Sequence, residues 1–126
     1  MIVNLKRLNG VHPDLITIMN LIGQKHDIAI LEGVRTPERQ KKLVARGSSK
    51  TMNSKHIIQS DGFAHAVDVT PFFDTDGDGD SEVSWAWPDY YPLAHAIKMK
   101  AKELGIVLQW GGDWKTFKDG PHWQLV

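Results

Sequence analysis

Residues 64–69 read Ala-His-Ala-Val-Asp-Val, and this run predicts a β-strand that Pro71 ends. Small and β-branched apolar side chains suit a buried strand, and a proline cannot donate a hydrogen bond to a neighbouring strand. One carboxylate, Asp68, interrupts the apolar run. Because side chains alternate along a strand, Ala66 shares the face of Asp68, whereas His65 points to the opposite face.

On either side of this strand the sequence predicts helices and further short strands. Pro13 suits the start of a first helix. Thr36 can cap a second helix, Pro37 suits its first position, and Gly47 can end it. Gly105 can end a third helix. The helices are expected at residues 13–22, 37–47 and 89–104, and the strands at 27–31, 106–110 and 123–126. No regular βαβ rhythm is present, so we expect an α+β fold with helices flanking a small, mainly antiparallel sheet.

The composition limits the class of protein. A length of 126 residues suits one domain, residues 1–126, which we expect to be a monomer. Fifteen basic and fifteen acidic side chains cancel, so nothing indicates a nucleic-acid partner. No apolar run approaches the roughly 20 residues of a membrane helix, and no signal peptide is recognisable. We therefore expect no membrane insertion, and a stay in the cytoplasm until another factor releases the protein.

Three side chains would meet if strands 64–69 and 123–126 are neighbours: His56, Asp68 and His122. The chain has no cysteine, so a metal must be held by such residues. Two imidazoles and one carboxylate leave a fourth tetrahedral position for water, the usual arrangement of a catalytic zinc site. Six histidines also offer such sets by chance, and a lone histidine is often a surface or hydrogen-bonded core residue. On these residues alone, both interpretations stay open.

The residues around these positions resemble the signatures of one zinc peptidase family. Ser54–His56, Gly62 and Ala66–Asp68 resemble the signature Ser-x-His…Gly-x-Ala-x-Asp, and Asp119–Trp123 resembles a second one, in which an acid precedes a histidine by three positions. The family contains D-alanyl-D-alanine carboxypeptidases and L-alanyl-D-glutamate endopeptidases, and the hedgehog signalling domain has a related fold. The short chain looks most like the phage endolysin branch.

Two further segments, Gly33–Thr36 and Trp110–Trp114, look like the family's arginine segment and the segment before its last strand. The resemblance therefore extends over about three quarters of the chain. It implies a fold of the hedgehog/D-Ala-D-Ala peptidase type.

The resemblance implies that His56, Asp68 and His122 are zinc ligands and that Asp119 is the general base. The gap between His56 and Asp68 is longer than is common in the family, so His65 is an alternative first ligand. Strand alternation argues against His65, because it places this side chain on the face opposite Asp68. Without the resemblance, Asp119 is equally well explained as a turn residue beside a glycine.

The resemblance also implies two substrate-binding residues. Arg35 would hold a substrate carboxylate or stabilise the oxyanion that forms during peptide hydrolysis, since its charge is fixed and its donors form a fork. Ser54 would hydrogen-bond to substrate or orient a ligand. From the residues alone, a simple ion pair at a strand end is the likelier role of Arg35.

The implied function is zinc-dependent hydrolysis of the L-alanyl-D-glutamate bond in peptidoglycan stem peptides, during host lysis. A D-alanyl-D-alanine carboxypeptidase would use the same residues. A wall-binding or signalling module of the same fold is the non-catalytic alternative. A degenerate module would be expected to lose a ligand or the base, and this chain keeps His56, Asp68, Asp119 and His122, which favours an enzyme.

An acidic, glycine-rich run at residues 74–80 resembles the start of a calcium loop. Glu82 falls at the ninth position, but the twelfth, where a bidentate glutamate is expected, is Trp85. An acidic surface turn without an ion fits equally well. The candidate Ca²⁺ ligands are Asp74, Asp76, Asp78 and Asp80.

Overall fold

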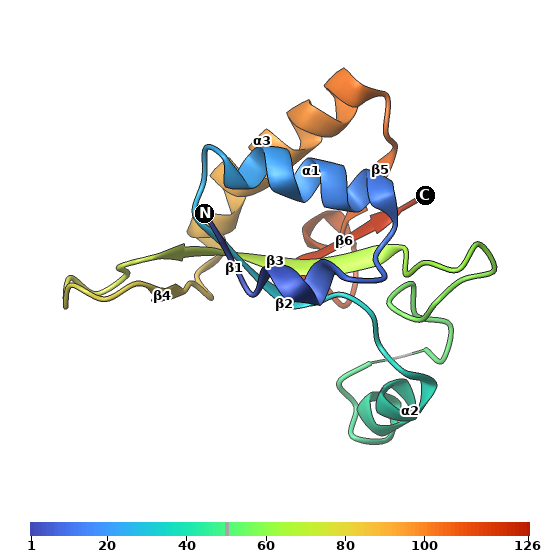
Figure 1. Cartoon of the computed structure of the whole chain (residues 1–126). Helices are drawn as coiled ribbons and strands as arrows, with labels where there is room; N and C mark the ends of the chain where they lie inside the picture. The colour runs from blue at the N-terminus through green and yellow to red at the C-terminus, as the bar shows by residue number, and fades with distance from the viewer. Residues whose placement is uncertain (50) are drawn as a thin grey trace.

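The computed structural model describes residues 1–49 and 51–126, and Figure 1 shows how the elements are arranged. They are β1 (Ile2–Val3), η1 (Leu5–Leu8), α1 (Pro13–Gly23), β2 (Ile28–Glu32), α2 (Pro37–Ala45), β3 (Ala66–Phe73), β4 (Glu82–Val83), α3 (Trp87–Leu104), β5 (Leu108–Trp110), η2 (Gly111–Asp113) and β6 (His122–Leu125). Thr36 caps α2 as expected, because its Oγ1 accepts a hydrogen bond from Arg39 N at 3.2 Å. Within the described ranges, none of the helices combines the length and apolar character needed to cross a bilayer.

The strands form one sheet in the order β1-β2-β3-β6-β5, with β4 paired to the far end of β3. β1 runs parallel to β2, and the other described pairs are antiparallel. Figure 1 shows α1 and α3 together on one face of the sheet and α2 standing apart on the other side. The expected α+β fold, with helices flanking a mainly antiparallel sheet, is confirmed.

The apolar core lies between the sheet and the helices α1 and α3. Trp123 of β6 contributes most volume, and its ring stacks on that of Trp110 in β5 at 5.8 Å between centroids. Other core side chains are Leu15, Ile18, Met19, Ile28, Ile30, Val67, Val69, Leu93 and Ile97. Because strand side chains alternate, this packing leaves Asp68 of β3 and His122 of β6 on the opposite face of the sheet.

The prediction that Pro71 ends the strand at residues 64–69 is wrong, since the corresponding strand, β3, continues to Phe73. The Pro71 carbonyl accepts a hydrogen bond from Ser84 N at 3.1 Å, but proline has no N–H to give back. The Ser84 carbonyl accepts instead from the Tyr90 hydroxyl at 2.8 Å. A side chain from α3 thus takes the place of the missing strand donor, and Asp68 lies near the start of β3 rather than at its end.

Other element ends differ from expectation by a few residues. α3 begins at Trp87 rather than residue 89, because Pro88 suits the first turn of a helix. β5 begins at Leu108, two residues later than expected, and β6 begins one residue earlier, at His122, which pairs with Asp68. The two-residue strands β1 and β4 are too short to show a periodic pattern in the sequence.

Candidate metal centre and active site

A β-bulge in β2 determines which face of the sheet carries Glu32. Ile30 pairs with Val69, whereas Glu32 pairs with Asp68, so the register shifts between Ile30 and Glu32. Regular alternation would turn Glu32 into the core beside Ile30, but the extra residue turns it to the face of Asp68.

Three potential metal ligands converge on this face. Asp68 and His122 are direct cross-strand partners in β3 and β6, and the loop before β3 brings His56 to them. Asp68 Oδ1 lies 3.1 Å from His56 Nε2 and 3.2 Å from His122 Nδ1. One ligand atom from each residue lies within 4.8 Å of the others. The structure thus brings together the three residues singled out from the sequence.

Each histidine is oriented by a partner on its other ring nitrogen. His56 Nδ1 lies 2.8 Å from the Gly33 carbonyl oxygen, and His122 Nε2 lies 2.8 Å from Gln124 Oε1. Both partners are acceptors, so we infer that these nitrogens carry the protons. The other two nitrogens, His56 Nε2 and His122 Nδ1, face Asp68, and a bound ion would take up their lone pairs. Metal-bound histidines are commonly held in this way, so the donor set fits a divalent ion such as zinc.

Gly33 is needed for this arrangement because a side chain there would collide with the Arg7 carbonyl oxygen. Without a side chain, the Gly33 backbone fits against η1. The Arg35 amide donates to the His56 carbonyl at 2.8 Å, which fixes the ligand loop beside Gly33.

The ligands form a strongly polarised group. Burial acts to raise the pKa of Asp68, but hydrogen bonds from His122 and His56 outweigh it and hold that pKa well below its usual range. Burial conversely acts to lower the pKa of His122, yet the hydrogen bond from its ring to Asp68 raises that pKa overall. Asp68 is therefore an ionised carboxylate at neutral pH, ready to pair with a cation.

Asp119 lies on the wall of the same pocket. Burial and the nearby Asp68 charge both raise the pKa of its carboxyl group. Its amide donates to the Gly111 carbonyl at 3.0 Å. A methyl group at Gly111 would collide with the Asp119 carbonyl oxygen and lie 3.1 Å from His122 Cβ, so this glycine allows the turn carrying both residues to pack closely.

Arg35 is tightly held by its neighbours. Its Nε and Nη2 donate to the two oxygens of Glu32 at 2.8 and 2.9 Å, and its Nη1 donates to Gln40 Oε1 at 2.8 Å. Ser54 Oγ lies 3.5 Å from Nη1, and Asp68 Oδ2 lies 3.8 Å from Nη2. Arg35 therefore connects β2 and α2 to the metal centre, and most of its donors are occupied.

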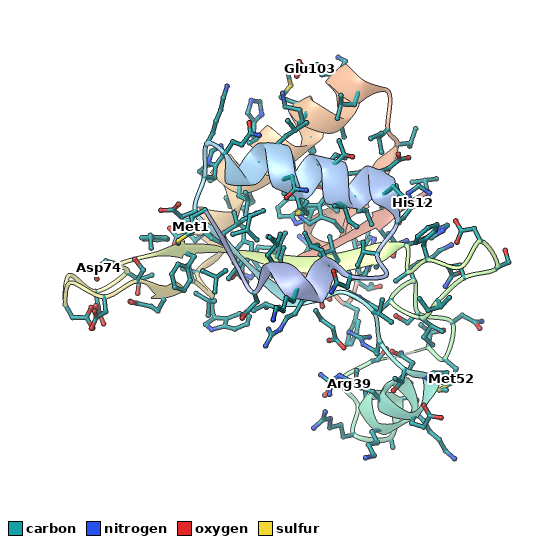
Figure 2. The ribbon with its side chains drawn as sticks, in the orientation of Figure 1. Met1, His12, Arg39, Met52, Asp74 and Glu103 are labelled. Carbon is teal, nitrogen blue, oxygen red and sulfur yellow. The ribbon has the colours of Figure 1, made fainter. Side chains whose placement is uncertain are left out.

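A pocket of about 380 Å³ opens over these groups. The ligand residues and Asp119 line one part of it, and polar residues that follow α2 line another. Figure 2 labels Arg39 on α2 and Met52 on the chain that follows it, in the part of the molecule that stands away from the sheet. The lining side chains are those of Glu32, Arg35, Leu43, Ser48, Ser49, Thr51, Asn53, Ser54, Lys55, His56, Asp68, Trp114, Phe117, Asp119, His122 and Gln124.

His65 belongs to a different cluster. Its Nε2 lies 2.7 Å from Asp61 Oδ2, and its ring centroid lies 5.2 Å from that of His12 at the start of α1. His56, rather than His65, is thus the histidine brought to Asp68.

The acidic loop between β3 and β4 gathers part of its expected ligand set. One carboxylate oxygen from each of Asp74, Asp76, Asp78 and Glu82 lies within 4.8 Å of the others, but Asp80 is not in the group. Figure 2 shows Asp74 on this loop, far from α2. Asp74 accepts hydrogen bonds from the amides of Gly77, Asp78 and Gly79.

Among the residues of the site that sequence reasoning missed are Glu32 and Gln124. Gln124 had a readable signal, because it lies two positions after His122 and so shares its strand face. Glu32 had none, since its orientation depends on the bulge in β2.

Known proteins are similar to this chain over most of its length. The family described as phage L-alanyl-D-glutamate peptidase matches residues 3–126. The L-alanyl-D-glutamate peptidase of Escherichia phage T5 is 31% identical over 120 residues, which cover 90% of this chain and 80% of that protein. The peptidase of the same name from Listeria phage A118 is 33% identical over 100 residues, covering 79% of this chain but only 30% of the relative. This chain thus spans less than a third of that longer protein.

Bacterial proteins are similar as well. The peptidoglycan L-alanyl-D-glutamate endopeptidase CwlK of Bacillus subtilis is 28% identical over 111 residues, 79% of this chain and 61% of that protein. The crystal structure of the L-Ala D-Glu endopeptidase ChiX of Serratia marcescens superposes with a TM-score of 0.80 and 40% identity, covering 96% of this chain and 84% of that one. The chain belongs to the phage L-alanyl-D-glutamate peptidase family.

Proposed function

We propose that the chain is a zinc-dependent endopeptidase that hydrolyses the L-alanyl-D-glutamate bond of peptidoglycan stem peptides and serves as an endolysin in host lysis. The observation that carries this proposal is the convergence of His56, Asp68 and His122 beside Asp119 in one pocket. The names of the phage T5 and Serratia relatives support the choice of bond.

His56, Asp68 and His122 would hold the ion through two imidazole nitrogens and one carboxylate oxygen. Bound zinc would polarise the scissile carbonyl and lower the pKa of a water molecule. The protein's contribution is to keep both histidines in the ligating tautomer, through the Gly33 carbonyl and Gln124.

Asp119 is the proposed general base. Its carboxylate takes a proton from the attacking water and later delivers that proton to the leaving amine. Burial raises the pKa of this carboxyl group, which moves it towards neutral pH and makes it a better proton acceptor than an ordinary aspartate.

Arg35 and Ser54 are the proposed substrate-binding residues. Arg35 would bind through its remaining N–H groups, because Glu32 and Gln40 occupy the others and Glu32 compensates its charge. The Ser54 oxygen accepts from His56 N at 3.1 Å, which leaves the hydroxyl hydrogen for a substrate oxygen.

Mass spectrometry of purified peptidoglycan after digestion tests the proposal. New amino termini on D-glutamate are expected, with about one zinc per chain in the purified protein. Release of terminal D-alanine would instead show a carboxypeptidase. An unchanged digest with the zinc-loaded protein would refute the enzymatic proposal and favour a wall-binding module.

We also propose that the loop carrying Asp74, Asp76, Asp78 and Glu82 binds calcium, with Asp80 outside the group of converging carboxylates. Support comes from this convergence of oxygen ligands, which hard cations prefer. Calorimetric titration is expected to show binding that Asp76→Asn weakens. Absence of heat at millimolar calcium would refute it.

A further inference from the structure

Positive charge is unevenly distributed along the wall of the pocket. Among the described residues that line the pocket, Arg35 and Lys55 are the two with an amino or guanidinium group. Two carboxylates compensate the charge of Arg35: Glu32, which pairs with its Nε and Nη2 and also with Arg39, and Asp68, whose Oδ2 lies 3.8 Å from Nη2. Within residues 1–49 and 51–126, Lys55 makes no hydrogen bond or ion pair through its side chain. The uncompensated positive charge of the described pocket wall is therefore on Lys55.

The backbone of Lys55 is fixed close to the metal centre. It directly precedes the ligand His56, and its carbonyl oxygen accepts a hydrogen bond from His65 N at 2.7 Å. Small polar side chains that can donate hydrogen bonds, those of Ser48, Ser49, Thr51 and Asn53, line the same pocket. A lysine among such donors is suited to binding a carboxylate.

An anionic substrate needs this charge, because the rest of the pocket is acidic. Glu32, Asp68 and Asp119 all line it. A negative group approaching them is repelled unless a cation on the pocket wall compensates. Zinc would compensate at the scissile carbonyl, and Lys55, on the pocket wall next to His56 in the chain, would compensate the charge of a neighbouring group of the substrate.

The proposed substrate has such a group. When the D-glutamyl residue continues the stem through its γ-carboxyl, its α-carboxylate is a free anion one carbon from the scissile nitrogen. We propose that Lys55 binds this α-carboxylate and so determines specificity for D-glutamate over its α-amide. This inference rests on the proposed endopeptidase function and adds a specificity residue to it.

Two synthetic stem peptides test the proposal, one with the free α-carboxylate and one with the α-carboxamide. The measured quantity is the ratio of their kcat/KM values. We expect the wild-type protein to favour the acid by about tenfold, the effect of one charge-assisted hydrogen bond. Lys55→Gln should reduce this ratio to about one, mainly through a higher KM for the acid, and Lys55→Arg should restore most of it.

Lys118→Gln is the matched control, because it removes the same charge next to Asp119 from a residue that does not line the pocket. Its ratio should equal that of the wild type. An unchanged ratio in Lys55→Gln, or an equal loss in Lys118→Gln, would overturn the role of Lys55 while leaving the proposed function intact. Cleavage of neither peptide by the zinc-loaded wild type would overturn the proposed function, and this inference with it.

Discussion

The chemistry of the site depends on which nitrogen of each histidine is free. Gly33 and Gln124 accept from one nitrogen of His56 and of His122, so the other nitrogen of each ring faces Asp68 and is the one that would bind an ion. A site prepared in this way needs little rearrangement to take up an ion. Single neighbours of the ligands should therefore change metal affinity.

Gln124→Leu removes the acceptor for His122 Nε2. We expect zinc affinity to fall about 10- to 100-fold, as for other partners of ligating histidines. Competition with a chromophoric chelator measures it. Gln124→Glu keeps an acceptor and should bind zinc nearly as the wild type does. Gln109→Leu is the control, because Gln109 contacts Gln124 at 3.2 Å but not the histidine. Wild-type affinity in Gln124→Leu would contradict the tautomer assignment.

Asp119→Asn removes the proposed base without removing a ligand. We expect kcat/KM to fall at least about 100-fold while the zinc content per chain stays the same. Metal analysis and peptide hydrolysis are measured on the same preparation. Asp113→Asn serves as the comparison, since Asp113 pairs with Lys98 at 2.6 Å and does not line the pocket. Full activity in Asp119→Asn would exclude the base role.

At the scale of elements, the site depends on local irregularities. The bulge in β2 turns Glu32 towards Asp68, and Gly111 lets the turn after β5 pack against Asp119 and His122. Neither strand alternation nor helix periodicity predicts such features. The bulge and the glycine therefore determine how the sheet orients the side chains of the site.

Gly111→Ala should push Asp119 and His122 apart, since the added methyl group meets backbone rather than a flexible side chain. We expect a loss of activity of about tenfold or more together with weaker zinc binding, measured by hydrolysis and chelator competition. Gly62→Ala separates crowding from backbone strain, because Gly62 has positive φ but open space around it. Zinc affinity lost equally in both variants would argue against the close contact at Gly111.

Glu32 should make stability depend on pH. Burial acts to raise its pKa, but hydrogen bonds from Arg35 and Arg39 outweigh it and lower that pKa. A carboxylate with a lowered folded-state pKa stabilises above its unfolded value of about 4.3, and this contribution is lost as the pH falls through the folded value. Glu32→Gln should therefore be less stable than wild type at pH 7, with a difference that shrinks below about pH 4 in urea unfolding. Glu103→Gln, from an exposed pair, should show little change.

The sequence predicted the three helices and the main strands because caps, prolines and apolar spacing are local signals. The candidate metal ligands were singled out through motif resemblance, since spacing alone left them among several histidines. The strand was predicted to end at Pro71 because proline cannot donate a hydrogen bond to the neighbouring strand. It continues because the hydroxyl group of Tyr90, a residue far along the chain, donates to the Ser84 carbonyl instead. The orientation of Glu32 could not be predicted because it depends on the bulge in β2. The occupation of the Arg35 donors could not be predicted either, because it depends on the folded position of Gln40.

For the whole molecule, the sheet separates two functions. One face packs on α1 and α3 and supplies stability, while α2 lies on the other side of the sheet (Figure 1). The pocket opens on that second face, which carries Asp68 and His122. The proposed ion would be bound by the two central strands and by the loop carrying His56. Metal binding should therefore stabilise the entire fold rather than one loop.

Removal of zinc by a chelator should lower the thermal midpoint, because a ligand that binds only the folded state stabilises it by about 2.7 kcal/mol at a free concentration 100 times its Kd. Calorimetric scans with and without chelator measure the shift. The His122→Ala variant should show none, since it lacks a ligand. A midpoint insensitive to chelator in the wild type would argue against a structural contribution from the ion.

Asp68 and His122 are 54 positions apart and yet are paired across adjacent strands. Contacts at such separation form slowly, since a long loop must close before they are gained. A polypeptide still being synthesised has neither a closed sheet nor a complete set of candidate ligands until β6 has been made. The hydrolysis proposed for this site could therefore begin only after β6 has paired with β3.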